Sequence, residues 1–112
     1  QNRNEKIAKV QLESANITLE QQKRSLESQL NSAFASYETN LELCKVEAKN
    51  LEIAEQNLDI TLSKFKIGTI TPIEFRTAQQ NFLDAKVRYS NAMYLTKIHE
   101  ITLKELAGSL SF

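Results

Sequence analysis

The amino-acid sequence predicts an all-α fold, namely a long antiparallel coiled-coil helical hairpin whose first helix is about twice as long as its second. The chain has 112 residues but only two Gly and one Pro, too few turn residues for a β-sandwich or barrel. Apolar residues recur at steps of three and four, which is the period of an amphipathic helix. One of the two Gly residues and the single Pro lie close together, at positions 68 and 72. We therefore expect one structural unit over residues 1–112.

The first helix is predicted over residues 3–67, because residues 1–67 contain neither Gly nor Pro. Its main apolar seam has coiled-coil spacing. The seam consists of Ala8, Leu12, Ala15, Leu19, Leu26, Leu30, Ala33, Tyr37, Leu41, Cys44, Ala48, Leu51, Ala54, Leu58, Leu62 and Phe65. A second apolar set lies beside it and consists of Ile7, Val10, Ile17, Phe34, Leu43, Val46, Ile53, Ile60 and Ile67. A stripe this wide predicts more than one helical neighbour.

The tip turn is predicted at residues 68–71. Gly68 suits the position just past a helix C-terminus, where the backbone becomes left-handed. Thr71 is a good N-cap, and Pro72 follows at the first helical position, where its missing N–H costs nothing. Glu74 can accept a hydrogen bond from the backbone N–H of Thr71, which completes a capping box. So short a connection makes the two helices antiparallel neighbours.

The return helix is predicted over residues 72–107, with Gly108 as its C-terminal capping residue. Its stripe is Phe75, Ala78, Phe82, Ala85, Tyr89, Ala92 or Met93, Thr96, Ile98 or His99, Leu103 and Leu106. At 1.5 Å per residue, the first helix is about 100 Å long and the second about 54 Å. The second helix then reaches back only to about residue 32. The apolar residues before that point need a partner from another chain or from a further part of the same protein.

Composition argues against several classes of function. Lys+Arg and Asp+Glu both number 14, so the zero net charge gives no electrostatic reason to bind nucleic acid. The single His, His99, and the single Cys, Cys44, are interpreted as ordinary surface or seam residues. We expect no catalytic residue, no metal and no cofactor, and therefore no enzyme. No apolar run approaches the roughly 18–20 residues that a membrane-spanning helix needs.

Several motifs occur together from residue 48 onward. The first is the apolar series Ala48, Leu51, Ala54 and Leu58. The second is the turn Lys64-Phe65-Lys66-Ile67-Gly68-Thr69-Ile70-Thr71-Pro72-Ile73-Glu74-Phe75, followed by Ala78-Gln79, Leu83, Ala85 and Tyr89. The third is the closing Leu106-Ala107-Gly108-Ser109-Leu110. In combination they resemble the C-terminal repeat of the TolC-type outer membrane efflux protein family.

This resemblance implies a fold, a location and partners. Family members are homotrimers in the outer membrane of Gram-negative bacteria, with long helices that form a periplasmic tunnel. The chain would be one hairpin of that tunnel, a passive conduit for efflux or export. A periplasmic adaptor (membrane fusion) protein would contact it, and an inner-membrane pump would act on it indirectly. The other repeat of the protein would cover the unpaired start of the first helix.

The resemblance also assigns roles near the turn. Gly68, Thr69, Ile70 and Thr71 form the tip that meets the adaptor, and we expect Ile70 to be exposed there. Glu74 matches the first of two acidic residues that line the tip in the family, which makes it a candidate pore-gate carboxylate as well as a helix cap. The second acidic position holds Thr77, and Ile70 stands where the family has an Arg. The resemblance therefore does not predict the family's complete acidic ring or its Arg-mediated contacts at the tip of this chain.

Two other interpretations remain open at this point. A structural or adaptor-type coiled-coil hairpin that mediates protein–protein contacts would share the same fold. The isolated 112-residue chain, with its uncovered apolar stripe, is also expected to be able to self-associate.

Overall fold

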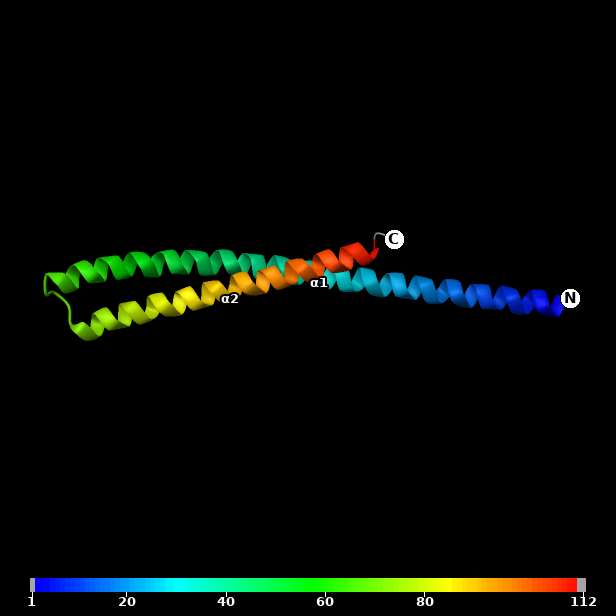
Figure 1. The fold of residues 1–112 in the computed structure, drawn as a ribbon, viewed down its shortest axis with the longest axis horizontal. Coiled ribbons are helices and arrows are strands. Elements are labelled where there is room, and N and C mark those ends of the chain that lie inside the picture. The colour runs from blue at the N-terminus through cyan, green and yellow to red at the C-terminus, as the bar shows by residue number, and fades with distance from the viewer. Residues whose placement is uncertain (1, 111–112) are drawn as a thin grey trace.

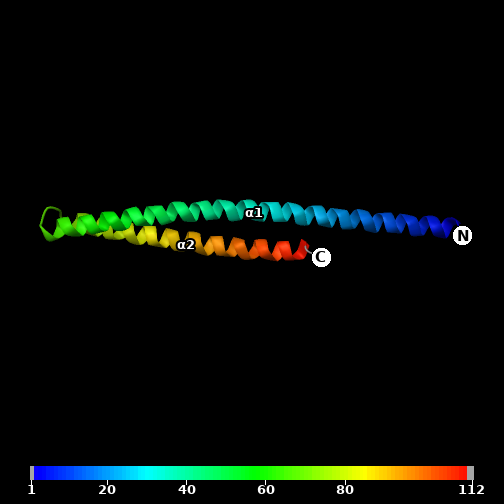
Figure 2. The same ribbon diagram turned by 90° about the horizontal axis from the view of Figure 1, so that it is seen from above.

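The computed structural model describes the backbone of residues 2–110 and the side chains of residues 2–109. This range consists of two helices, α1 (Asn2–Lys66) and α2 (Pro72–Leu110), and contains no strand. The helices have 65 and 39 residues, and the molecule measures 99 × 20 × 13 Å. Figures 1 and 2 show α2 running back along α1 and ending part-way, while the N-terminal part of α1 continues alone. The predicted helical hairpin with a longer first helix is confirmed.

The end of α2 differs from the prediction. Gly108 does not cap the helix in a left-handed conformation, because Gly68 is the only residue with positive φ in the described part of the chain. The helix instead continues to Leu110. A single Gly inside a helix costs only about 1 kcal/mol, and no Pro follows to stop the helix. The Ser109 hydroxyl also donates to the carbonyl oxygen of Glu105 (3.1 Å), a bond within the last turns of the helix.

Three alanines seven residues apart form the most buried part of the seam. Ala78, Ala85 and Ala92 are 5%, 1% and 2% exposed, because α1 lies directly against their faces. Seven residues correspond to nearly two helical turns, so the three alanines lie in line along α2. Ala92 rather than Met93 therefore occupies the seam, and half-buried His99 rather than Ile98 continues it.

The seam of α1 is more polar than predicted. Three predicted members, Leu41, Ala48 and Leu62, are half-buried, but so are the residues just before each of them. Those residues are Asn40, Glu47 and Thr61. They complete a strict alternation of steps of four and three, which also includes Leu26, Leu30, Ala33, Tyr37, Cys44, Leu51, Ala54 and Leu58. Polar side chains therefore lie on the contact face at a period that apolar residues alone did not reveal.

The beginning of α1 has no neighbour in this chain. Every described residue from 2 to 25 is exposed, although the apolar seam continues through Leu12 and Leu19. Partial burial begins at Leu26. The covered region starts before the predicted residue 32, because α2 extends to Leu110.

Candidate functional site: the hairpin turn and its outer edges

The turn begins with a left-handed glycine at the end of α1. Gly68 has φ of +77°, and its backbone N–H donates to the carbonyl oxygen of Phe65 (3.0 Å). The N–H of Thr69 donates to the carbonyl oxygen of Lys64 (3.0 Å). These two bonds are the pair that defines a Schellman motif, and they satisfy carbonyl groups that the helix end leaves without partners. The hydroxyl of Thr69 adds a third bond to the Lys64 oxygen (3.1 Å).

Both hydrogen bonds of the capping box are present at the start of α2. The Thr71 hydroxyl accepts a bond from the Glu74 N–H (3.2 Å), and the Glu74 carboxylate accepts one from the Thr71 N–H (3.2 Å). Pro72 is the first residue of α2, where its ring already has a helical φ. The side chain of Glu74 is thus tied to the turn through one carboxylate oxygen, while the residue as a whole stays exposed.

An aromatic pair joins the two helices next to the turn. The rings of Phe65 and Phe75 stack with centroids 4.9 Å apart and an interplanar angle of 13°. Such pairs contribute about 0.5–1.5 kcal/mol beyond the apolar area that they bury. The two caps and this stacked pair make the tip a defined structure rather than a loose loop.

The exposure of the apolar side chains at the tip corrects one expectation. Ile70 is half-buried, so it is not the exposed residue that the sequence suggested. Ile67 and Ile73, which flank the turn, are 74% and 75% exposed. The exposed apolar surface of the tip therefore comes from the last residue before Gly68 and the second residue of α2. Both residues belong to the turn motif of the sequence, but neither is predicted there as an exposed contact residue.

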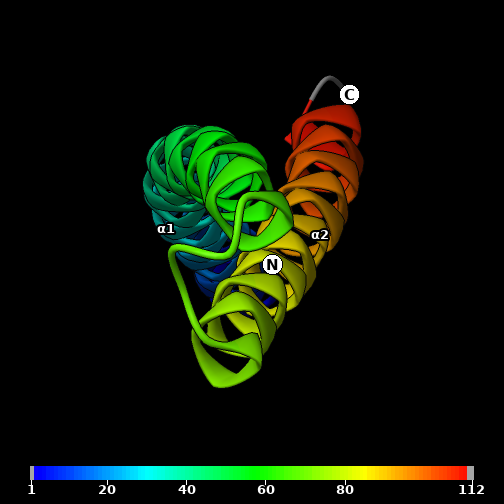
Figure 3. The same ribbon diagram turned by 90° about the vertical axis from the view of Figure 1, so that its left-hand side faces the viewer.

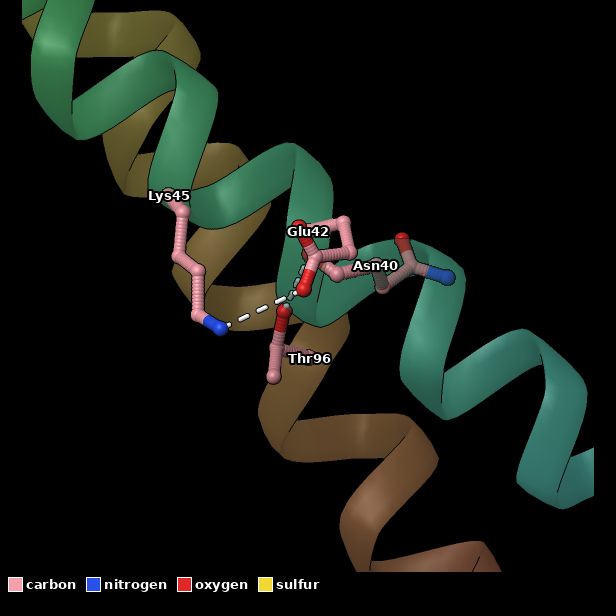
Figure 4. Close-up of polar contacts among 4 residues, drawn as sticks. All are labelled: Asn40, Glu42, Lys45 and Thr96. Atoms are coloured by element: carbon pink, nitrogen blue, oxygen red, sulfur yellow. Dashed lines mark hydrogen bonds and ion pairs between the residues drawn. The ribbon is translucent and has the colours of Figure 1, made fainter.

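Two polar contacts cross the seam away from the tip. The Thr96 hydroxyl donates to the backbone carbonyl oxygen of Asn40 (3.1 Å) and also approaches that of Ala92 (2.8 Å). Figure 4 shows Thr96 on α2 reaching across to α1 at Asn40. The guanidinium of Arg88 donates from Nε to the Glu47 carboxylate (3.1 Å), whose side chain is only 14% exposed. Because these bonds join specific partners, they set the register in which the two helices pair.

Each helix also carries an apolar stripe on the side turned away from the seam. The stripe of α1, called here the α1 edge, consists of Val46, Ile53, Ile60 and Ile67. The stripe of α2, called the α2 edge, consists of Leu83, Val87, Tyr94, Ile98 and Ile101. All nine side chains are exposed in the hairpin. Figure 3, which looks along the hairpin, shows α1 and α2 side by side. The sequence spacing of each stripe places its residues on the part of the helix surface that does not face the other helix.

The two edges overlap over only part of their length. Glu47 lies beside Arg88 and Asn40 beside Thr96, which sets the level of each α1 residue against α2. By this register Ile53 of the α1 edge lies level with Leu83 of the α2 edge. The rest of the α1 edge toward Ile67 lies nearer the tip, and the rest of the α2 edge toward Ile101 lies farther from it. A hairpin with an apolar edge on each helix is suited to pack between two further helices.

The Glu100 carboxylate has a lowered pKa. A hydrogen bond from Lys104, together with the nearby charges of Lys104 and Lys97, lowers the pKa of Glu100 below its usual value. The Nζ atoms of Lys104 and Lys97 lie 3.1 and 3.4 Å from the two carboxylate oxygens. All three residues belong to α2, so this cluster supports the helix itself rather than a site between helices.

The remaining candidate residues lie apart from one another. His99 and Cys44 are half-buried on the seams of different helices. Within residues 2–110 no three His, Cys, Asp or Glu side chains are grouped so that they could hold a metal ion. In the same range neither helix contains a stretch that is both long enough and apolar enough to cross a membrane.

Comparison with known proteins defines the class to which this hairpin belongs. The family model described as outer membrane efflux protein matches residues 1–109. The chain therefore belongs to the outer membrane efflux protein family, whose members are channel and transport proteins. Searches of curated proteins and of solved structures gave no significant match.

Proposed function

We propose that this chain is one helical hairpin in the periplasmic tunnel wall of a TolC-type, trimeric outer-membrane efflux channel. The observation that carries the proposal is the pair of exposed apolar edges on opposite sides of the hairpin. A hairpin that mediates one contact needs one apolar face. A hairpin that forms part of a closed wall of helices has a neighbour on each side and needs an apolar surface on both. Membership of the outer membrane efflux protein family is the reason for proposing that this wall is the tunnel of an efflux channel.

The uncovered start of α1 supports the same proposal. Residues 2–25 expose Ile7, Val10, Leu12, Ile17 and Leu19 along a helix that has no partner in the chain. A free amphipathic helix of this length gains little stability in water from its own hydrogen bonds. We propose that helices from the other repeat of the protein cover it in the assembled tunnel.

The tip is proposed as the adaptor contact. Gly68, Thr69, Ile70 and Thr71 form a turn held by the Schellman motif and the capping box, so its shape is fixed before a partner arrives. The exposed side chains of Ile67 and Ile73 supply apolar surface at the same end. A rigid turn with apolar surface on both sides suits contact with another helical hairpin, because little conformational entropy is lost on binding.

Glu74 is proposed as the pore-gate carboxylate at this end. Three copies in a trimer bring three carboxylates around one axis, and each is oriented by its bond to the Thr71 N–H. Transport through the tunnel is passive, and energy comes from an inner-membrane pump acting through the adaptor. Opening then requires helix pairs at the tip to move against one another.

Single-channel recording of the full-length protein in a planar lipid bilayer tests this proposal. We expect stepwise currents that change in Glu74→Gln, a substitution that removes the charge but keeps the length of the side chain. Gln79→Glu is the matched control, because it alters the charge of an exposed α2 residue on another face. If stepwise currents are recorded and Glu74→Gln leaves them unaltered, the conduit is supported and Glu74 acts only as a helix cap.

A tip that stays tightly closed would also give no current, so the test includes a variant with a loosened turn, Thr71→Ala. If folded, trimeric protein carries no current either as the wild type or as Thr71→Ala, the proposal that it is a conduit is contradicted. That result would favour an adaptor-type or structural hairpin instead.

A further inference from the structure

The charges of the hairpin are unevenly distributed along its length. We define the tip segment as residues 62–76, which are the turn and the part of each helix within about 8 Å of it, one screening length at physiological ionic strength. Its charged residues are Lys64, Lys66, Glu74 and Arg76, and all of them are exposed. The chain as a whole has no net charge, so the tip segment carries a local excess of positive charge.

The three cations of the tip segment have no carboxylate partner in the hairpin. Among the described residues, no ion pair includes Lys64, Lys66 or Arg76. The cations that do form ion pairs in that range all lie further from the turn, namely Lys45, Lys49, Arg88, Lys97 and Lys104. The next carboxylates along the chain are Asp59 and Asp84. At 1.5 Å per residue, they lie about 10 and 18 Å from the helix ends.

The stability of the helices explains only part of this charge. Lys64 and Lys66 lie in the last turn of α1, where the helix dipole favours a cation. Arg76 lies near the start of α2, where the dipole gives a cation no such support. Glu74, the one carboxylate of the tip segment, is bound to the backbone N–H of Thr71 rather than to a cation. The excess of cations therefore goes beyond what the two helix ends need.

We propose that the tip end of the conduit favours anionic solutes, such as carboxylates and phosphates, an inference that rests on the proposed function. Three hairpins of a trimer would bring their tip segments around one axis, and each adds the same excess of positive charge. An opening lined by charges of one sign concentrates solutes of the opposite sign. Rings of Lys and Arg side chains select anions in pores for the same reason.

The inference does not depend on which face of the hairpin points to the axis. Lys64 and Lys66 are two residues apart, which places them about 200° apart around α1. Both side chains are exposed, so neither lies between the helices. One cation is therefore present on either side of α1 at the end of the molecule where the turn lies (Figure 1).

The ion selectivity of the full-length protein in a planar lipid bilayer tests the inference. In a KCl gradient, the sign of the reversal potential shows whether Cl⁻ or K⁺ passes more easily. We expect the wild type to prefer Cl⁻. The triple substitution Lys64→Gln, Lys66→Gln and Arg76→Gln should abolish or reverse this preference, because Glu74 is then the only charged residue of the tip segment. The preference of the wild type should also weaken with added salt, since the screening length falls from about 10 Å at 0.1 M to about 3 Å at 1 M.

The matched control is the triple substitution Lys45→Gln, Lys49→Gln and Lys97→Gln. It also removes three exposed cations, but each lies beside a carboxylate and far from the turn. The control should therefore shift the reversal potential less than the tip variant does. A wild type that prefers K⁺, a tip variant with an unchanged reversal potential or a control with an equal shift would overturn the inference.

The proposed function and this inference fail in different ways. If only the variant with the loosened turn, Thr71→Ala, carries current, all selectivities are measured in that background. If folded, trimeric protein is silent both as the wild type and as Thr71→Ala, the conduit is contradicted and the inference with it. Stepwise currents with the wrong selectivity contradict the inference alone.

Discussion

The two parts of α1 have the same kind of sequence but different surroundings. Residues 26–66 lie against α2, and their seam is half-buried, whereas every described residue of 2–25 is exposed. The apolar seam nevertheless runs through both parts, with Leu12 and Leu19 in the first and Leu51 and Leu58 in the second. The helical period therefore encodes a contact face along all of α1, while this chain supplies a partner for only part of it.

The largest expected effect on stability distinguishes the part of the seam that is packed between α1 and α2 from the part of α1 that has no partner. Ala85→Leu adds bulk at a position that is 1% exposed against α1, so it should destabilise the hairpin by about 1–3 kcal/mol. Ala15→Leu is the matched control in the uncovered part of α1, and it should change the free energy of unfolding by less than about 0.5 kcal/mol. Chemical denaturation followed by circular dichroism measures both. Equal effects at the two positions would show that the seam is not packed as described.

A second comparison contrasts the two glycines. Gly68→Ala forces a side chain into a left-handed conformation and should cost about 1–2 kcal/mol, although the space around the new Cβ is open. Gly108→Ala places a better helix former inside α2, where nothing lies within 4 Å of the added atom, and should stabilise it by about 0.5–1 kcal/mol. Opposite shifts in the unfolding midpoint are expected. A stabilising Gly68→Ala would refute the Schellman turn.

The next prediction compares an ion pair that crosses the covered seam with one that does not. Coupling between Glu47 and Arg88, measured by a double-mutant cycle with Glu47→Gln and Arg88→Met, should be about 0.5–1 kcal/mol. Much of the Arg88 side chain remains in water, which limits the value. The pair Glu42–Lys45, which lies within α1 and is mostly exposed, should give a coupling close to zero. A larger coupling for the exposed pair would argue against a register-setting role for Arg88.

The smallest effect concerns Glu100. Its pKa is lowered by Lys104, so Lys104→Ala should raise the pKa toward the usual value, as NMR titration of the side-chain carboxyl would measure. A lowered folded-state pKa means that the ion pair stabilises α2 at neutral pH. That contribution is lost as the pH falls through the folded-state pKa, in the acidic range. Lys97→Ala should shift the pKa less, because the hydrogen bond from Lys104 is the largest cause. A larger shift from Lys97→Ala would reverse that order.

Sequence reasoning predicted the features that depend on local chemistry. The hairpin, the left-handed Gly68 and the reciprocal bonds of Thr71 and Glu74 follow from residue types at fixed offsets, and these offsets survive whatever packs around them. The adaptor contact and the gating role of Glu74 stay predictions, because they depend on chains outside the hairpin.

The features that were missed depend on packing or on weak signals. Asn40 and Glu47 lie on the seam, but a search for apolar residues passes over polar ones, and only the strict alternation of three and four would have found them. The place of Ile70 in a turn favours exposure, yet Ile70 is half-buried, and its burial depends on tertiary contacts that residue types alone do not give. Gly108 resembled a helix stop, but a lone Gly with no Pro after it is a weak terminator.

Hydrogen–deuterium exchange of residues 2–25 in two samples tests whether this part of α1 belongs to a continuous wall of helices. One sample is the isolated 112-residue chain, and the other is the assembled full-length protein in detergent. We expect fast exchange in the isolated chain at low concentration, because these residues have no neighbour. We expect strong protection in the assembly, where other helices cover the seam. Exchange that stays equally fast in the assembly would contradict the claim that this part of α1 belongs to a continuous wall.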